Sequence, residues 1–208
     1  CIRDRNNMGR KALDVQRINN PQKKQAWVIQ LFPFLQKKGL KNITMDEVAK
    51  ELNKSKATIY KYFKSQNEIW EYTVQYKLEA IKKFELILND KNIPYVERYM
   101  LAIQHLYDEM ELVSNLFLKD LKHLYPHIWQ QVLDFQLYAI EVLRNYYING
   151  IEKGFFIDIN PSIMILSDQL FFQALSEPNF LISNGLTIQA AFQACLLYTS
   201  PSPRDIGE

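Results

Sequence analysis

The most regular feature of this chain is the spacing of its apolar residues, which recur every three to four positions over most of its length. That spacing is the period of an amphipathic helix and not the two-residue period of a half-buried strand. It predicts helices over the approximate ranges 22–38, 45–52, 56–63, 66–88, 94–113, 115–122, 126–153 and 162–175, and one more from 187. In the first helix the expected buried residues are Ala26, Ile29, Leu31, Phe34 and Leu35. We therefore expect an all-α fold of about nine helices.

The stretch 39–69 contains the strongest signals for helix ends. Thr44, with Glu47 three residues later, has the spacing of a capping box, in which each side chain bonds to the backbone N–H of the other residue. Asn53 tolerates the left-handed backbone conformation that a tight turn needs, and Ser55 is a second helix N-cap. Two short helices joined by a turn of about three to four residues form a helix-turn-helix, which is what this stretch predicts.

The second of these helices carries side chains that suit nucleic acid. Thr58 offers a hydroxyl and a methyl group to base edges, while Tyr60 and Tyr62 offer phenolic donors to phosphate oxygens. The cations that would displace counterions from DNA are Lys54, Lys56, Lys61 and Lys64. The residues available for packing are Ala57, Ile59 and Phe63. A helical hairpin with a solvated basic face would have the same spacing, although the chemistry favours DNA.

The same stretch resembles the DNA-binding domain of the TetR/AcrR-type family of bacterial transcriptional regulators. The residues that carry the resemblance are Gly39, Thr44, Ala49, Ser55, Thr58, Ile59, Tyr60, Tyr62, Phe63 and Ser65. The sequence departs from the family pattern at Asn53, Ala57, Lys64 and Gln66; the last stands where the family often has a lysine that contacts phosphate. Together with the chemistry above, the resemblance implies that DNA is contacted by Thr44, Lys54, Ser55, Lys56, Ala57, Thr58, Tyr60, Lys61, Tyr62 and Lys64.

The net charge of +2 conceals two oppositely charged halves. Residues 1–67 hold 15 Lys and Arg against 5 Asp and Glu, whereas residues 68–208 hold 10 against 18. A basic N-terminal module on an acidic remainder indicates a polyanionic partner at one end only. We expect a flexible basic arm over 1–20, a DNA-binding domain over 21–67 and a helical ligand-binding and dimerisation domain over 68–195.

The resemblance implies a homodimer whose last two helices pair with their copies. The helix over 162–175 supports this, because it has more apolar surface than one neighbour needs. The expected interface residues are Ile163, Leu166, Leu170, Phe171, Leu175, Ile188, Ala191 and Phe192. A two-fold dimer would place its recognition helices in successive major grooves of double-stranded DNA and would favour an inverted-repeat operator.

The resemblance also implies a cavity for a hydrophobic or aromatic effector within the C-terminal module. The candidate lining residues are Phe84, Tyr99, Ile103, His105, Tyr107, Phe117, Trp129, Phe135, Tyr138 and Phe172. An aromatic stripe at helical spacing is more often part of a core, so this alternative stays open for each residue. Asp120 and His123 lie one turn apart, as metal ligands can, but a helix-end aspartate and a surface histidine explain that spacing equally well.

Other function classes find little support. No nucleophile–base pair, glycine-rich phosphate loop or metal cluster has a telling spacing, so we expect neither an enzyme nor a cofactor. No run of about 18 apolar residues would span a membrane, and the two cysteines fit a reducing cytoplasm. Residues 195–205 resemble a translated sequencing adapter, and we expect residues 196–208 to be a non-native tail.

The sequence thus predicts a cytoplasmic, sequence-specific transcriptional regulator, namely a homodimeric repressor that a ligand releases from DNA by shifting the helix that begins near residue 66. The alternative is a nucleoid-associated or protein-tethering module that uses the same helix-turn-helix without an effector.

Overall fold

The computed structural model describes residues 17–156, 160–175, 177–187 and 190–191. These residues are largely helical and include no strand, which confirms the all-α prediction. The helices are α1 (Pro21–Lys38), α2 (Met45–Glu51), α3 (Lys56–Tyr60), α4 (Gln66–Lys82), α5 (Phe84–Asn89), α6 (Tyr95–Glu111), α7 (Asn115–Leu124), α8 (Pro126–Glu152), α9 (Pro161–Leu175) and α10 (Pro178–Ser183).

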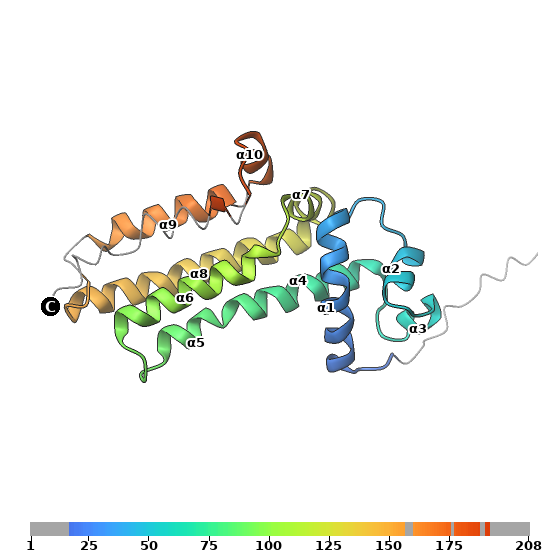
Figure 1. The fold of residues 1–208 in the computed structure, drawn as a ribbon, viewed down its shortest axis with the longest axis horizontal. Helices are drawn as coiled ribbons and strands as arrows, with labels where there is room; N and C mark the ends of the chain where they lie inside the picture. The colour runs from blue at the N-terminus through green and yellow to red at the C-terminus, as the bar shows by residue number, and fades with distance from the viewer. Residues whose placement is uncertain (1–16, 157–159, 176, 188–189, 192–208) are drawn as a thin grey trace, which may run out of the picture.

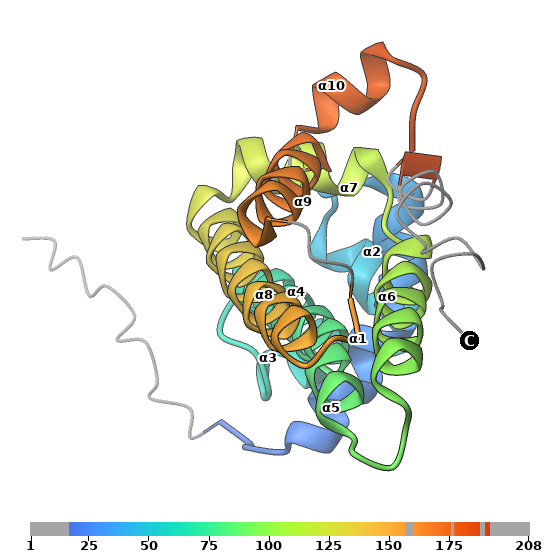
Figure 2. The same cartoon turned by 90° about the vertical axis from the view of Figure 1, so that its left-hand side faces the viewer.

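The molecule has two parts, which we call the head (α1–α3) and the body (α4–α10) (Figure 1). The long helices α4, α6 and α8 run along the long axis of the body, while α1 crosses that direction at the head. α4 begins in the head and continues into the body. Seen from the side in Figure 2, α9 packs along α8, and α10 lies over α7.

The head packs around one side of α1. The buried residues of that helix are Trp27, Val28, Leu31, Phe32 and Leu35. The ring of Trp27 lies 4.8 Å from that of Tyr62 and 6.3 Å from that of Phe63, so the tryptophan fixes which side faces inward. The prediction that Ala26 and Ile29 are buried was wrong, since both are exposed. The prediction was based on the spacing of the aliphatic residues and did not include Trp27, whose side chain has the largest apolar area to bury.

The predicted helix over 66–88 is in fact two helices, because the chain turns at Lys83 between α4 and α5. The backbone N–H of Lys83 donates to the carbonyl oxygen of Ala80 at 3.3 Å, which is the tighter turn of a 3₁₀ helix. Nε2 of His105, on α6, lies 2.9 Å from the same oxygen. A carbonyl oxygen can only accept, so this ring nitrogen carries the proton. The periodicity of α4 alone gave no sign of this contact.

The end of the body farthest from the head is an aromatic cluster. Tyr95 stacks on Tyr146 with ring centroids 4.3 Å apart, and on Phe155 at 4.7 Å. Gly150 allows this packing, because a Cβ there would lie 2.2 Å from the ring of Phe156. The cluster therefore joins the start of α6 to the end of α8 by close ring contacts.

A buried polar chain runs beside the aromatic cluster and holds α9. The Tyr147 hydroxyl donates to Oδ2 of Asp168 at 2.9 Å, and it lies 3.1 Å from the Tyr99 hydroxyl. Burial raises the pKa of Asp168 to about 6, although the hydrogen bond from Tyr147 lowers it. The same burial, with the nearby Tyr99 and Asp168, raises the pKa of the Tyr147 phenol far above its ordinary value.

Candidate nucleic-acid interface

Local hydrogen bonds fix the two short helices of the head. Thr44 and Glu47 form the predicted capping box, with the Thr44 N–H donating to Oε2 of Glu47 at 2.9 Å and the Glu47 N–H donating to Oγ1 of Thr44 at 3.3 Å. Lys38 also donates to Glu47, at 2.9 Å. These hydrogen bonds, that from Lys38 foremost, lower the pKa of Glu47 to about 2. The start of α2 is therefore tied to the end of α1.

The turn between α2 and α3 has the conformation that the sequence predicted. Asn53 has φ of 52°, in the left-handed region that asparagine tolerates. The N–H of Lys54 donates to the carbonyl oxygen of Ala49 at 2.9 Å, which closes the turn. Ser55 caps α3 by accepting from the N–H of Thr58 at 3.1 Å. The helix-turn-helix is thus present as predicted.

α3 is shorter than predicted, ending at Tyr60 instead of Phe63, and it presents a basic surface to solvent. Ile59 and Phe63 are buried beneath it, whereas Ala57 is exposed and does not pack as the sequence pattern suggested. We call the exposed set the α3 surface; its residues are Lys54, Ser55, Lys56, Ala57, Tyr60, Lys61 and Lys64. Thr44 is also exposed, at the start of α2.

Two of the predicted contact residues are less accessible than the others. Thr58 is half-buried, and its hydroxyl lies 2.9 Å from that of Ser55. Tyr62 is only 7 % exposed and packs edge-on against Trp27, with Lys23 Nζ 4.9 Å from its ring centre. Tyr60 is therefore the more accessible of the two phenols predicted to reach phosphate.

Lys56 has a partner within the head. Its Nζ lies 2.9 Å from a carboxylate oxygen of Asp46, in the first turn of α2. Hydrogen bonding to Asp46 raises the pKa of Lys56 above its ordinary value. The lysine therefore remains a cation, and its side chain is directed toward the first turn of α2.

Two further hydrogen bonds connect segments of the head, and the sequence predicted neither of them. Nε2 of Gln66 donates to the carbonyl oxygen of Ile43 at 2.6 Å, so this side chain ties the start of α4 to the loop before α2. The N–H of Ile18 donates to the carbonyl oxygen of Lys61 at 2.9 Å, which places the exposed Arg17 near the end of α3. Residues 1–16 of the predicted arm lie outside the described residues.

The comparisons with known proteins agree with this geometry. Residues 34–73 match the sequence model of the family described as bacterial regulatory proteins, tetR family. This segment contains the helix-turn-helix and the first turns of α4. The helix-turn-helix therefore matches the sequence pattern of that family. The recognition made from the motif residues is thereby confirmed for this segment.

Solved structures of TetR-family regulators share the whole fold. The crystal structure of a TetR-family transcriptional regulator from Marinobacter aquaeolei VT8 superposes with a TM-score of 0.66 at 15% identity, over 87% of this chain and 92% of that one. The crystal structure of a protein assigned to the same family from Rhodococcus sp. superposes with a TM-score of 0.59 at 11% identity. The match covers 84% of this chain and 95% of that one. No curated protein sequence matches this chain. The likeness shows that the head and the body together have the fold of these structures.

The predicted interface residues of α9 divide into exposed and packed positions. Ile163, Leu166 and Leu170 are 62 %, 55 % and 58 % exposed and are spaced by three and four residues, so they form one stripe. Phe171 and Ala191 are half-buried and pack against the core. The side chain of Leu175, and both Ile188 and Phe192, lie outside the described residues, as does most of the helix predicted from 187. The nearby α10 was not predicted.

Most of the predicted ligand residues that the structure describes belong to the core or pack against it. Phe84, Phe117 and Trp129 are buried in the core, and Phe117 lies at the junction of head and body, with its ring 6.2 Å from that of Phe32. His105 is engaged with Ala80, as described above. Ile103, Tyr107, Phe135 and Tyr138 are half-buried, Tyr99 belongs to the buried polar chain, and the side chain of Phe172 lies outside the described residues.

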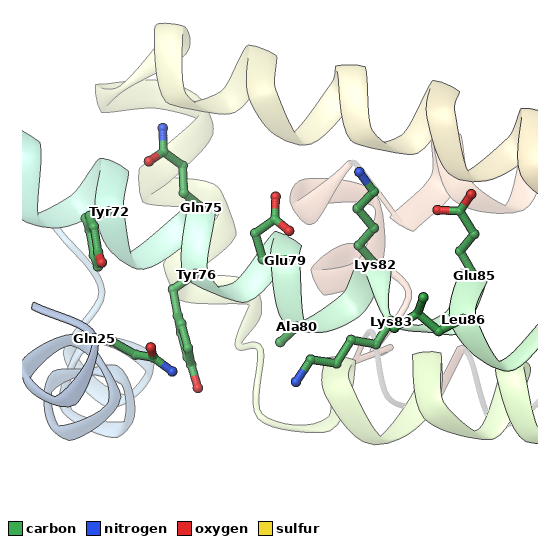
Figure 3. Close-up of a pocket in the computed structure, with 10 residues that line it drawn as sticks. All are labelled: Gln25, Tyr72, Gln75, Tyr76, Glu79, Ala80, Lys82, Lys83, Glu85 and Leu86. Carbon is green, nitrogen blue, oxygen red and sulfur yellow. The ribbon is translucent and has the colours of Figure 1, made fainter. Parts of the chain in front are cut away.

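An open groove of about 820 Å³ runs along α4 (Figure 3). Its lining residues are Gln25, Tyr72, Gln75, Tyr76, Glu79, Ala80, Lys82, Lys83, Glu85 and Leu86. None of the predicted ligand residues whose side chains the structure describes is among them. The lining is more polar and charged than the apolar cavity that the sequence predicted.

No described helix is both long and apolar enough to cross a membrane. Across the described residues, no three His, Cys, Asp or Glu side chains lie together as metal ligands would. Asp120, which the spacing paired with His123, is buried and bonded to backbone N–H groups, whereas His123 is exposed.

Proposed function

We propose that this protein is a homodimeric, sequence-specific transcriptional regulator, acting as a repressor that a small molecule releases from DNA. The observation that carries the proposal is the α3 surface, where exposed Lys, Ser and Tyr side chains surround a short helix capped by Ser55. Recognition helices present such residues to the major groove, with cations on the flanking phosphates. Residues 68–208, by contrast, hold 10 Lys and Arg against 18 Asp and Glu.

The stripe on α9 supports the homodimeric part of the proposal. Three large aliphatic side chains on one face of a helix, all more than half exposed, are costly to leave in water. Phe180 and Ile182 on the adjoining α10 are also half exposed and extend the apolar area. A second copy of the chain, packing about a two-fold axis, would bury both areas and bring two α3 surfaces to one side of the dimer.

Control by a ligand follows from the position of α4, which begins in the head and lines the groove in the body. A molecule bound along this helix would favour one placement of the head over another. It would release DNA only to the extent that it binds the DNA-incompetent state more tightly. The mixed polar and aromatic lining fits a ligand with both a ring and charged or hydrogen-bonding groups.

A second candidate is a nucleoid-associated or tethering module without an effector. It is favoured by the packing of the residues that were expected to line a cavity, since Phe84, Phe117 and Trp129 are instead buried in the core. A solid body would hold the head in one position and offer no site for a ligand.

Selection from a random duplex library, at low and moderate salt, tests the proposal. A dimeric regulator will enrich an inverted repeat with half-sites about 34–36 Å apart, or a multiple of that distance. Binding that falls steeply with salt but enriches no sequence would instead support the nucleoid-type module. Absence of binding at both salt concentrations would exclude both candidates. The enriched duplex then serves in a screen for small molecules that release it.

A further inference from the structure

A buried polar contact between head and body centres on Asp120 of α7. Its Oδ2 accepts hydrogen bonds from the backbone N–H groups of Leu40 at 2.7 Å and Lys41 at 2.8 Å, about 80 positions earlier in the chain. Asp120 is only 8 % exposed. A buried carboxylate requires such donors, and hydrogen bonds to a charged acceptor are strong and directional.

The backbone of the head is shaped to receive this carboxylate. Gly39 ends α1 with φ of 71°, a conformation that side chains strongly disfavour. A Cβ on Gly39 would lie 2.4 Å from Oδ2 of Asp120 and 3.0 Å from Cγ of Leu116. At the corner between α1 and α2, glycine thus permits both the positive φ of the backbone and the close approach of the Asp120 carboxylate. With Gly39 in this conformation, the N–H groups of Leu40 and Lys41 point at Asp120.

A second polar contact lies nearby and joins the end of α1 to the start of α7. The Ser114 hydroxyl, which caps α7, donates to the carbonyl oxygen of Gln36 at 2.7 Å. The Ser114 N–H donates to Oε1 of Gln36 at 2.8 Å. The other side of α7 is tied to the α10 region, where Lys122 Nζ lies 2.5 Å from Glu177 and Nδ2 of Asn115 donates to the carbonyl oxygen of Leu186 at 2.8 Å.

These contacts give the head two attachments to the body. One is to α4, against which α1 packs, with Lys24 Nζ 3.2 Å from Oε1 of Glu68 and the Tyr72 hydroxyl donating to the carbonyl oxygen of Pro21 at 3.2 Å. The second attachment, between the α1 region and α7, adds contacts with a different helix and therefore constrains how the head is turned on the body. The apolar contact of Phe32 with Phe117 contributes packing there, while the Asp120 hydrogen bonds impose direction.

We propose that Asp120 is a positioning residue that fixes the orientation of the head on the body and thereby sets the half-site separation that the dimer accepts. The proposal that Asp120 sets the half-site separation rests on the proposed dimeric function. The proposal that Asp120 fixes the orientation of the head applies to a single protomer and requires neither DNA nor a dimer. Asp120 itself does not touch DNA in this assignment; it acts through the α1–α2 corner.

The first test compares affinities for the selected operator and for the same operator with three base pairs inserted between its half-sites. The ratio of the two affinities is expected to fall by about tenfold in Asp120→Ala, since the lost hydrogen bonds to a charged group held the head in place. Asp120→Asn keeps an oxygen at the same position and is expected to retain most of the ratio. Asp134→Ala, an exposed aspartate on α8, is the matched control and is expected to leave it unchanged.

A protein that was merely less folded would bind both duplexes more weakly by the same factor and leave the ratio intact. An intact ratio in Asp120→Ala would therefore overturn the assignment of half-site spacing. Gly39→Ala provides a second variant, because its added Cβ displaces the carboxylate while Asp120 remains present; its ratio is expected to fall as well.

The second test measures orientation without DNA. Spin labels are attached at Lys50→Cys on α2 and Leu137→Cys on α8, both exposed, with Cys1 and Cys195 replaced by Ser. Labelled chains are diluted with unlabelled protein so that only distances within one protomer contribute. The distance distribution is expected to broaden in Asp120→Ala and to stay narrow in Asp120→Asn.

An unchanged distribution in a folded Asp120→Ala protein would overturn the positioning role. If the unmodified chain selects no inverted repeat, the proposed function fails, and this second measurement still decides whether Asp120 holds the head.

Discussion

The head and the body of this protein differ in how much of their stabilisation comes from residues close together in the sequence. The head packs around Trp27 but also has short-range polar bonds, such as the Thr44–Glu47 capping box and the Ser55 cap, whose partners lie three residues apart. The body uses contacts between residues far apart in sequence, such as Tyr95 with Tyr146 and Tyr147 with Asp168. Local bonds leave a clear pattern in a sequence, whereas long-range packing does not. The function that could be recognised therefore belongs to the head.

The largest effect is expected from removing the central side chain of the head. Trp27→Ala should destabilise the protein by about 3–5 kcal/mol, because it leaves a cavity between α1 and the rings of Tyr62 and Phe63. DNA binding should be lost with it. Chemical denaturation and a binding titration measure both. Ile29→Ala, on the exposed side of the same helix, should cost less than about 1 kcal/mol, and a comparable loss in both variants would show that the inward face is misassigned.

In the body, the buried Asp168 should make stability depend on pH. Its folded pKa of about 6 lies above the ordinary value of 3.8, so the folded state binds the proton more tightly than the unfolded state does. Stability is therefore greatest below pH 4 as far as this group is concerned, and about 2–3 kcal/mol is lost as the pH rises through 6. Asp168→Asn should remove this contribution. Unfolding free energies from pH 4 to 8 test it, with the exposed Asp134→Asn as control.

The α9 stripe gives the next effect. Leu166→Lys should weaken self-association by about 2 kcal/mol or more while leaving the helical content intact, because it places a charge in the proposed interface. Leu101→Lys, on an exposed part of α6, makes the same chemical change elsewhere and should leave association unaltered. Sedimentation over a range of concentrations distinguishes them. Equal association of the two variants would place the dimer contact elsewhere.

The smallest effects are expected at the α3 surface. Lys61→Ala should weaken binding to all sequences alike by about 1 kcal/mol and reduce the slope of log affinity against log salt by about one, since it removes one phosphate contact. Thr58→Ala should instead change which sequence is preferred. Titrations of selected and unrelated duplexes at several salt concentrations separate these outcomes. An unchanged salt slope in Lys61→Ala would exclude its contact with phosphate.

The sequence by itself determined the helical fold, the capping residues and the helix-turn-helix. Each of these depends on residues within about four positions of one another, so a local sequence pattern is enough to predict it. Asn53 was expected in the left-handed conformation from its residue type alone, and the structure has it there. The exposed stripe of Ile163, Leu166 and Leu170 was likewise visible as apolar surface in excess of what one neighbouring helix needs.

Only the tertiary structure decided which aromatic residues pack together, where α4 ends and what Asp120 does. Asp120 and Leu40 are 80 positions apart, and no periodic pattern connects a helical aspartate with two backbone amides in a distant turn. His105 and Ala80 pose the same difficulty across 25 positions. Such contacts arise because a buried polar group no longer bonds to water and must form a hydrogen bond with another group of the protein nearby. Which partner is nearest depends on how the helices pack, and a one-dimensional pattern does not contain that information.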